Sequence, residues 1–291
     1  KLLSKSIETI FEQKQQSSHE QLRGYGFSQK MINRFYKPFF SGIFLEDNLT
    51  TPNRMFDFVM KMFSDGDAAV PALGMEEIPK QLLKHLPDNC IQYNTKVTSI
   101  EGNTITTESG EKIISDTILI ATEANPFIAK YKPEVTLAHR SVTNVYFEAK
   151  EAPSKKAVVI LNALNTKEIV NNLTVMSNVS SQYAPKGKVL VSVSCNGIFD
   201  LSDQELTHKI KTELQPWFGQ QLTQWQHIKT YKIEYALPKL KDLKDTITIA
   251  DVKLNGNLYC CGDHLMNGSI NAAMKSGRVV ASIIAEESNK K

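Results

Sequence analysis

The 291-residue sequence contains no apolar run that approaches the ~18 residues of a membrane-spanning helix. Its net charge is only +3, and its lysines gather in short runs typical of solvated surfaces. The first absence argues against an integral membrane protein. The second argues against nucleic-acid binding, which needs a clustered basic surface.

Cysteine and histidine are also scarce. No two of the six histidines have the His-x-x-x-His spacing of metal ligands on one helix face, and the four cysteines have no metal-ligand spacing. We therefore predict no metal site and rank a metal-dependent hydrolase built on Asp263 and His264 as a minor alternative. The absence of a disulfide pattern favours a reducing, cytoplasmic location.

A further absence concerns nucleotide binding. Dinucleotide-binding domains normally open with a strand, a Gly-x-Gly-x-x-Gly turn and a helix. The sequence contains no such fingerprint, and it begins at Lys1 within a helical pattern, without an initiator methionine. A complete dinucleotide-binding domain is therefore not encoded in these residues.

The most informative feature present is a strand, turn and helix near the C-terminus. The apolar run Leu258 to Cys261 predicts a buried strand, and it stops at Gly262 and Asp263. Open α/β sheets bind their ligands at this edge. Gly268 and Ser269 predict a turn and an N-cap, followed by a helix over residues 270–285. The exposed N–H groups of its first turn suit a phosphate or an electron-rich carbonyl.

The side chains of this helix predict how it packs. One face carries Ile270, Met274, Gly277, Ala281 and Ile284, and the small residues Ala272, Ala273, Ser276 and Gly277 would allow close approach to a sheet or a flat ligand. In the preceding strand, Cys260 and Cys261 would point to opposite faces as inert packing residues.

A second segment also combines a glycine turn, a helix and a buried strand. Residues 71–75 form a glycine-containing turn before a helix predicted over residues 76–85. Alternating residues and glycine turns then predict an antiparallel meander over residues 94–116. The apolar run Thr117 to Ala121 predicts another buried strand.

In their order and separation, these segments resemble the FAD-dependent amine oxidase superfamily, which includes phytoene desaturases and protoporphyrinogen oxidases. The resemblance rests on Gly262-Asp263, on Gly268-Ser-Ile-Asn-Ala-Ala and on Ser276-Gly277-Arg278, and it extends from about Gly26 to Ala285. It implies a noncovalent FAD. The residues expected at this cofactor are Val97, Gly262, Asp263, Gly268, Ser269, Ile270 and Asn271.

Four of these positions have an implied role. The resemblance places Asp263 at the ribityl-pyrophosphate region, the backbone of Ile270 and Asn271 at the flavin pyrimidine edge, and the backbone of Val97 at adenine. Relatives carry their phosphate-binding βαβ unit before the point that corresponds to Lys1. We therefore expect this chain to be the C-terminal portion of a longer enzyme, and to be inactive and weak in FAD binding by itself.

The predicted fold class is α/β (α+β), with a partial Rossmann-like FAD/NAD(P)-binding domain and a substrate domain of antiparallel sheet and helices. We assign residues 1–70 to the helical part of the substrate domain, 71–130 to the middle of the FAD-binding domain, 131–250 to the substrate domain and 251–291 to the end of the FAD-binding domain.

Within the substrate domain, Ser28 predicts the cap of a helix that Pro38 ends, and Thr51 predicts the cap of a helix with Pro52 at N1. The Phe- and Met-rich stripe of residues 55–63 is predicted as core, with a lining role in a substrate tunnel as the alternative. A capping box at Ser202 starts a helix that we expect to run to Leu214, before Pro216.

The resemblance also bears on the substrate. Amine-oxidising members carry a Lys where Val142 or Thr143 stands, and an aromatic residue where Ser269 stands, so an apolar substrate of the polyene or porphyrin type is favoured. Tyr235, Tyr146 and Phe56 are the candidate lining residues. No acid-base group stands out, so the catalytic residues stay unassigned.

Two questions stay open at this point. A flavin-free, non-catalytic binding protein of the same fold is the main alternative to an enzyme. A peripheral membrane contact and a homodimer are also left open as interactions of the chain.

Overall fold

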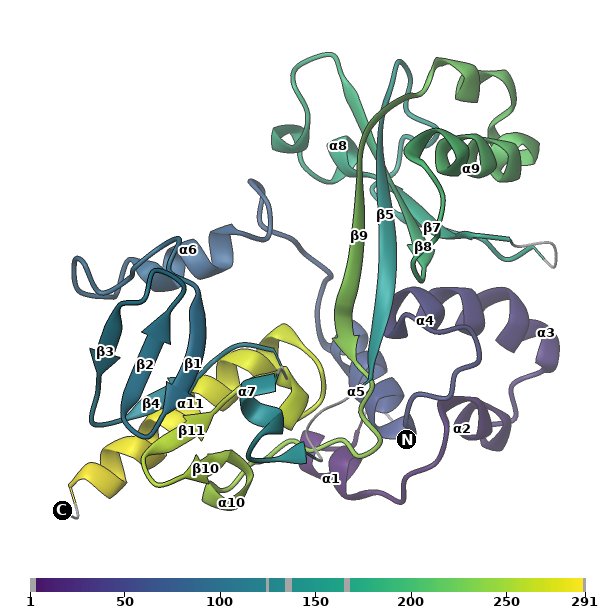
Figure 1. Cartoon of the computed structure of the whole chain (residues 1–291). Coiled ribbons are helices and arrows are strands. Elements are labelled where there is room, and N and C mark those ends of the chain that lie inside the picture. Colours follow the sequence, from purple (N-terminus) through teal and green to yellow (C-terminus); the bar gives the residue numbers. More distant parts are fainter. Residues whose placement is uncertain (1–3, 124–125, 134–137, 165–167, 290–291) are drawn as a thin grey trace. The chain divides into compact units, whose positions relative to one another are not determined.

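The computed structural model describes residues 4–123, 126–133, 138–164 and 168–289. The chain forms two compact units (Figure 1). Unit 1 comprises Lys1–Gln13, His85–Ala138 and Pro238–Lys291, and unit 2 comprises Lys14–Lys84 and His139–Leu237. Each unit is therefore assembled from segments that are far apart in the sequence.

These divisions differ from the predicted boundaries at residues 70, 130 and 250, for identifiable reasons. The hydroxyl of Tyr183 donates to the carbonyl of Pro71 (2.8 Å), which ties residues 71–84 to unit 2. The backbone N–H of Lys244 donates to the carbonyl of Met266 (3.0 Å), which ties the segment after Pro238 to unit 1.

Unit 1 has an antiparallel meander, as the alternation predicted. Its strands are β1 (Val97–Glu101), β2 (Thr104–Thr107) and β3 (Lys112–Ile114), in the order β1-β2-β3. Gly102 and Gly110 make the turns with φ of +57° and +85°, a backbone region that glycine enters without strain. The meander prediction is confirmed.

A second sheet in unit 1 has the order β10-β11-β4, formed by β10 (Lys253–Asn255), β11 (Leu258–Cys260) and β4 (Ile118–Ile120). β11 pairs in parallel with β4, with Leu258 opposite Ile118 and Cys260 opposite Ile120. The predicted parallel strand ending at Gly262 is therefore present. The helices of unit 1 are α1 (Ile7–Glu12), α7 (Pro126–Ala129), α10 (Ile249–Val252) and α11 (Ile270–Ser288).

The second sheet has a separate core on each face. On one face, Cys261 packs with Ala272 and Val280 of α11. On the other face, Cys260 packs with Ile100 of the meander and with Ile128 of α7. The two adjacent cysteines thus serve opposite cores, as the strand period predicted.

Unit 2 has a five-stranded sheet in the order β6-β7-β8-β5-β9. Its strands are β5 (His139–Ala149), β6 (Val159–Leu161), β7 (Val170–Val175), β8 (Val189–Asn196) and β9 (Gln226–Pro238). β5, β6, β7 and β8 pair antiparallel. Alternate residues such as Val145 and Phe147 pack against Leu206 and Ile210 of α9 (Asp203–Phe218), so one face of the sheet carries the core.

Helices build the other part of unit 2. They are α2 (Ser18–Gly24), α3 (Gln29–Met31), the π-helical turn η1 (Ile32–Tyr36), α4 (Lys37–Phe44), α5 (Asn53–Asp65) and α6 (Glu77–Leu83). Tyr36, Phe40 and Phe56 meet in their core. The short segments α8 (Met176–Val179), η3 (Ser181–Tyr183) and η4 (Gly219–Gln224) complete the unit.

Three predicted helix boundaries were wrong. Pro38 does not end its helix, because the N–H of Lys37 bonds the carbonyl of Ile32 in a π-turn, and the wider turn accommodates the proline ring. Pro52, not Thr51, precedes the first residue of α5, and the Thr51 hydroxyl accepts from Arg140 (2.7 Å) instead of capping the helix. α9 continues through Pro216 to Phe218.

Candidate functional site

The candidate site begins where β11 leaves its parallel partner. The N–H of Cys261 donates to the carbonyl of Ile120 (3.0 Å), and the N–H of Gly262 donates to Ser276 Oγ of α11 (2.9 Å). A Cβ on Gly262 would lie 2.4 Å from Cε1 of His264, whose side chain is buried. Glycine is therefore required where the strand turns into the loop.

The loop from Asp263 to Ser269 is held by its own backbone. The carbonyl of Asp263 accepts from the N–H of Met266 and from the N–H of Gly268, both at 3.1 Å. Residues Asp263–Leu265 form the single 3-10 turn η5, and Gly268 has φ of +63°. The sequence predicted the glycine turn but not the 3-10 turn.

Ser269 caps α11 as predicted. Its Oγ accepts from the N–H of Ala272 (3.1 Å) and donates to Asn267 Oδ1 (2.7 Å). Ser269 has extended backbone angles (φ −136°, ψ 159°), as an N-cap residue should. The serine therefore joins the loop at Asn267 to the first turn of the helix.

The first turn of α11 is open. Ile270 is 54% exposed and Asn271 is also exposed. Within the described part of the chain, no backbone acceptor bonds the N–H of Ile270 or of Asn271. The site thus presents two outward N–H donors at the positive end of a long helix, beside an apolar surface made by Ile270 and Met274.

The buried face of α11 is not the predicted apolar face. Ala272, Ser276 and Val280 are buried against the sheet, whereas Ile270 and Met274 are exposed. The small residues Ala272 and Ser276 do allow the close approach that was predicted. The Gly262–Ser276 hydrogen bond, in contrast, has no signal in the sequence beyond the small size of Ser276.

The remaining predicted residues belong to other elements of the two units. Val97 is half-buried at the start of β1 and packs on the Ile118–Cys260 core, also in unit 1. Tyr146 and Tyr235 belong to unit 2, where Tyr146 contacts Tyr231 edge-on at 5.9 Å. Phe56, only 2% exposed, lies in the helical core of unit 2.

The rings of Tyr146 and Tyr235 lie on neighbouring strands of their sheet, β5 and β9. Tyr146 meets Tyr231 edge-on, and Tyr235 meets His139 edge-on at 5.1 Å. Phe147, the neighbour of Tyr146, packs on Trp225 and also contacts His227 of β9. Aromatic contacts therefore join β5 to β9.

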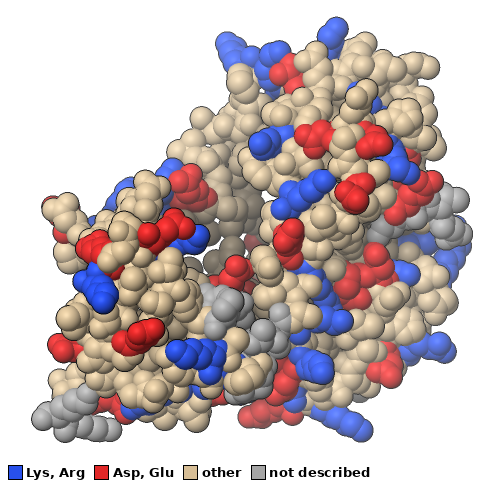
Figure 2. Space-filling model, viewed as in Figure 1, with Lys and Arg blue, Asp and Glu red and all other residues tan. Residues whose placement is uncertain are grey.

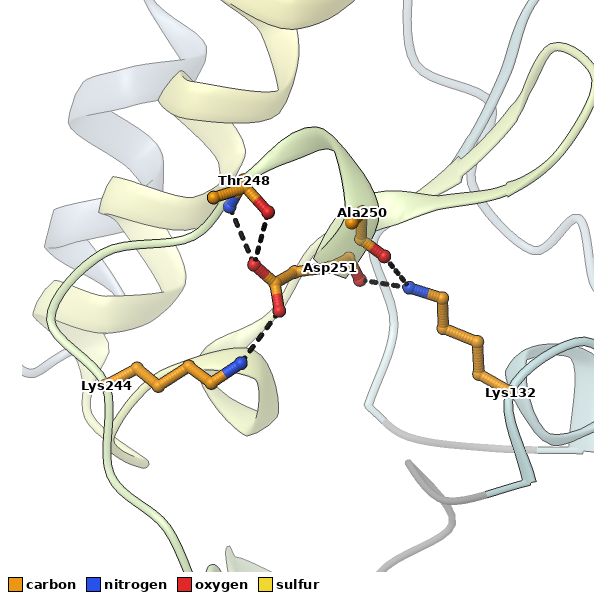
Figure 3. Close-up of polar contacts among 5 residues, drawn as sticks. All are labelled: Lys132, Lys244, Thr248, Ala250 and Asp251. Carbon is orange, nitrogen blue, oxygen red and sulfur yellow. Dashed lines mark hydrogen bonds and ion pairs between the residues drawn. The ribbon is translucent and has the colours of Figure 1, made fainter.

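A polar network braces the segment that precedes β11 (Figure 3). The carboxylate of Asp251 accepts from the N–H of Thr248 (2.7 Å) and pairs with Lys244 (2.8 Å). Lys132 donates to the carbonyl of Asp251 (2.7 Å) and to that of Ala250. A Thr-x-x-Asp pattern is the sequence signal for this cap, and our sequence analysis missed it.

Burial and charge shift several groups in unit 1. Burial raises the pKa of Cys260 to about 11 and also raises that of Cys261, so both thiols stay protonated and inert near neutral pH. Burial also pushes the pKa of Asp251 upward, but hydrogen bonds from Lys244 and Thr248 outweigh it and hold this pKa below its ordinary value.

A separate pocket of about 400 Å³ lies in unit 2, between α4 and the loop after β6. Its wall includes Lys37, Ser41 and Asn162. Glu213 of α9 fixes this loop, because its carboxylate accepts from Asn162 Nδ2 (2.7 Å) and from the N–H groups of Glu168, Ile169 and Val170 (2.9–3.0 Å). None of the predicted cofactor residues lines the pocket.

We also searched the described residues for a metal site and for a membrane-spanning helix. In the described ranges, no group of three His, Cys, Asp or Glu side chains could hold a metal ion. No helix among those residues is long and apolar enough to cross a membrane. Acidic and basic side chains are interspersed over the face shown in Figure 2, in keeping with the small net charge.

The chain is similar to a known protein family. The model of the flavin-containing amine oxidoreductase family matches residues 4–285. No curated protein sequence matches the chain.

Three solved structures show the fold. An oxidoreductase from Methanosarcina mazei has a TM-score of 0.69 at 15% identity, over 95% of this chain and 70% of its own. Cyclohexylamine oxidase from Brevibacterium oxydans has 0.59 at 11% identity, over 99% and 71%. Reduced UDP-galactopyranose mutase has 0.57 at 14% identity, over 89% and 66%. By its match over nearly the whole sequence, the chain belongs to the flavin-containing amine oxidoreductase family.

Proposed function

We propose that the chain is part of an FAD-dependent oxidoreductase that oxidises or desaturates an apolar substrate. The observation that carries the proposal is the open first turn of α11, at the carboxyl end of a parallel strand. Two N–H donors without backbone acceptors and an exposed apolar side chain at Ile270 fit the carbonyl edge and the flat face of a flavin ring.

The residues that would hold the cofactor all lie in unit 1. The N–H groups of Ile270 and Asn271 would meet the pyrimidine edge, Asp263 the ribityl-pyrophosphate region, and the backbone of Val97 the adenine. Gly262, Gly268 and Ser269 would shape the loop between them. When bound, FAD supplies the hydride acceptor, while these side chains and backbone groups bind and orient it.

The substrate class rests on two positions. Val142 and Thr143 stand on β5 where the amine-oxidising branch carries a lysine, and Ser269 stands where that branch carries an aromatic residue. Tyr146 and Tyr235, on the neighbouring strands β5 and β9, offer rings to an apolar molecule. These features support an apolar substrate over a charged amine.

A proline exchange tests the cofactor proposal. Ile270→Pro removes one outward N–H but preserves the helix, because Ser269 is already extended and proline is favoured at N1. Ile270→Ala keeps the N–H and removes the same apolar side chain. We expect Ile270→Pro to weaken FAD binding by about fivefold to tenfold relative to Ile270→Ala, as loss of one hydrogen bond predicts.

Flavin absorbance and fluorescence titration of the purified full-length protein with FAD give the readout. Equal affinity of the two variants would contradict the proposed role of the Ile270 N–H. A full-length protein that acquires no flavin bands even with excess FAD would overturn the enzyme proposal, and a flavin-free binding protein would replace it.

A second experiment tests the substrate class. The flavin-loaded protein is mixed without oxygen with a polyene, a porphyrinogen or a primary amine, and bleaching of the flavin absorbance is followed. We expect bleaching with an apolar compound. Bleaching by the amine alone would contradict the substrate proposal but would leave the flavin proposal intact.

A further inference from the structure

One run of unit 2 combines aromatic and basic residues without any acid. Between Glu20 and Glu46 the sequence has seven aromatic residues and four basic residues, Arg23, Lys30, Arg34 and Lys37, and no Asp or Glu. The run covers most of α2, α3, η1 and α4. Aromatic and basic residues in one helical run are typical of segments that lie on a membrane surface.

The structure divides these aromatic side chains between two faces. Tyr36, Phe40 and Phe44 are buried in the helical core. Phe35, in contrast, is 40% exposed, and Phe27 and Met31 before it are also exposed. The π-helical turn η1 joins α3 to α4, with right-handed helical backbone angles at both junctions.

Five exposed side chains and the half-buried ring of Phe39 make up what we call the aromatic patch: Phe27, Met31, Phe35, Phe39, Met62 and Phe63. The rings of Phe35 and Phe39 stack with centroids 5.7 Å apart, and those of Phe39 and Phe63 are 5.5 Å apart. Phe63 is 44% exposed, so this row of rings extends from η1 across α4 to α5.

The charges beside the patch indicate its partner. Arg23, Lys30 and Arg34 are exposed. Among the described residues, no carboxylate forms an ion pair with any of these three. An aromatic surface beside cations without ion-pair partners suits a binding partner that has an anionic outer layer and an apolar interior.

We propose that the aromatic patch docks on the surface of a bilayer that contains anionic lipid. Rings and methionines would enter the boundary between headgroups and acyl chains, and Arg23, Lys30 and Arg34 would meet the lipid phosphates. This inference stands on the helices of unit 2 alone and does not depend on flavin binding.

Sedimentation with vesicles tests the apolar part. The protein is mixed with vesicles of phosphatidylcholine alone or with phosphatidylglycerol added. We expect binding to the anionic vesicles, and a loss of at least about tenfold in the double variant Phe35→Ser/Phe63→Ser. The control Ile114→Ser removes an equally apolar side chain that is 79% exposed on β3, and it should bind as before.

A second pair of variants tests the charges. Lys30→Gln/Arg34→Gln should weaken binding by about tenfold or more and make it less sensitive to salt. Lys155→Gln/Lys186→Gln removes two exposed lysines of unit 2 outside the patch and should bind as the unaltered protein does.

Fluorescence places the patch even if a serine variant folds poorly. The conservative variant Phe35→Trp should be quenched by brominated lipid, whereas Ile114→Trp should not. No binding to anionic vesicles, equal losses in the control variants, or quenching at Ile114 alone would overturn the proposal. Patch-dependent self-association without vesicle binding would do the same and would point to a second copy of the chain.

Discussion

At the scale of single residues, the candidate site depends on a position that only glycine can occupy. Gly262 admits no Cβ because the buried ring of His264 occupies the space, whereas Gly277 of α11 has no atom within 4 Å of its Cβ position. The same exchange at the two glycines should therefore have opposite effects.

We expect Gly262→Ala to lower the free energy of unfolding by about 1–3 kcal/mol, as overpacking does. Gly277→Ala should raise it by about 0.5–1 kcal/mol, because alanine is the better helix former. Urea unfolding of the two variants measures the difference. A stabilised Gly262→Ala would mean that His264 can move away from the loop.

Asp251 gives a prediction about pH. Its folded pKa is held below the ordinary value, so its stabilising contribution is complete above the unfolded pKa of about 4 and is lost as the pH falls through the folded pKa. Asp251→Asn should lower stability by about 1 kcal/mol at pH 7, where a charged cap is lost.

The difference between Asp251→Asn and the unaltered protein should shrink as the pH falls below about 4. Unfolding curves at pH 7 and at decreasing acid pH measure it. A constant difference across this range would show that Asp251 acts through packing and not through its charge.

At the scale of elements, local sequence patterns predicted whether a segment is a helix or a strand better than they predicted where it ends. The meander, the capping box of Ser202 and the strand and helix around Gly262 follow from spacing alone, and all are present. Pro38 and Pro216 misled the prediction, because a π-turn and tertiary packing let both helices continue. Which face of α11 is buried also depends on the partner sheet, which the helix sequence does not encode.

The long-range contacts of α9 could not be predicted either. Glu213 looks like an ordinary surface residue in the sequence, yet its carboxylate accepts four hydrogen bonds from the loop after β6. Glu213→Gln replaces one acceptor oxygen by an NH₂ group that faces N–H donors. We expect it to cost about 2 kcal/mol of stability.

A matched exchange controls for the lost charge. Glu148 pairs with Lys188 at 2.5 Å on the surface of the same sheet, and Glu148→Gln should cost less than about 0.5 kcal/mol because such pairs contribute little. Chemical unfolding of both variants provides the comparison. Equal losses would show that the loop contacts of Glu213 add nothing beyond charge.

At the scale of the whole molecule, each unit has its own cores. Among the residues that the structure describes, two buried clusters lie entirely in unit 1 and two lie entirely in unit 2. Leu206→Ala in the sheet core of unit 2 should lower the free energy of unfolding of this unit by about 2–5 kcal/mol.

Hydrogen exchange can then show whether the units unfold separately. We expect faster exchange at the amides of β5, β7 and β8 in Leu206→Ala, with little change at β4 and β11 of unit 1. Equal acceleration in both units would show that they unfold as a single cooperative body.

The parallel pairing of β4 with β11 has a consequence for synthesis on the ribosome. Ile118 to Ile120 leave the exit tunnel long before Leu258 to Cys260 are made, whereas the strands of unit 2 all follow one another between these two segments. The apolar β4 therefore stays without its partner β11, with both edges unpaired, while the strands of unit 2 are made. A nascent chain stalled before Leu258 should be the form that molecular chaperones hold most tightly.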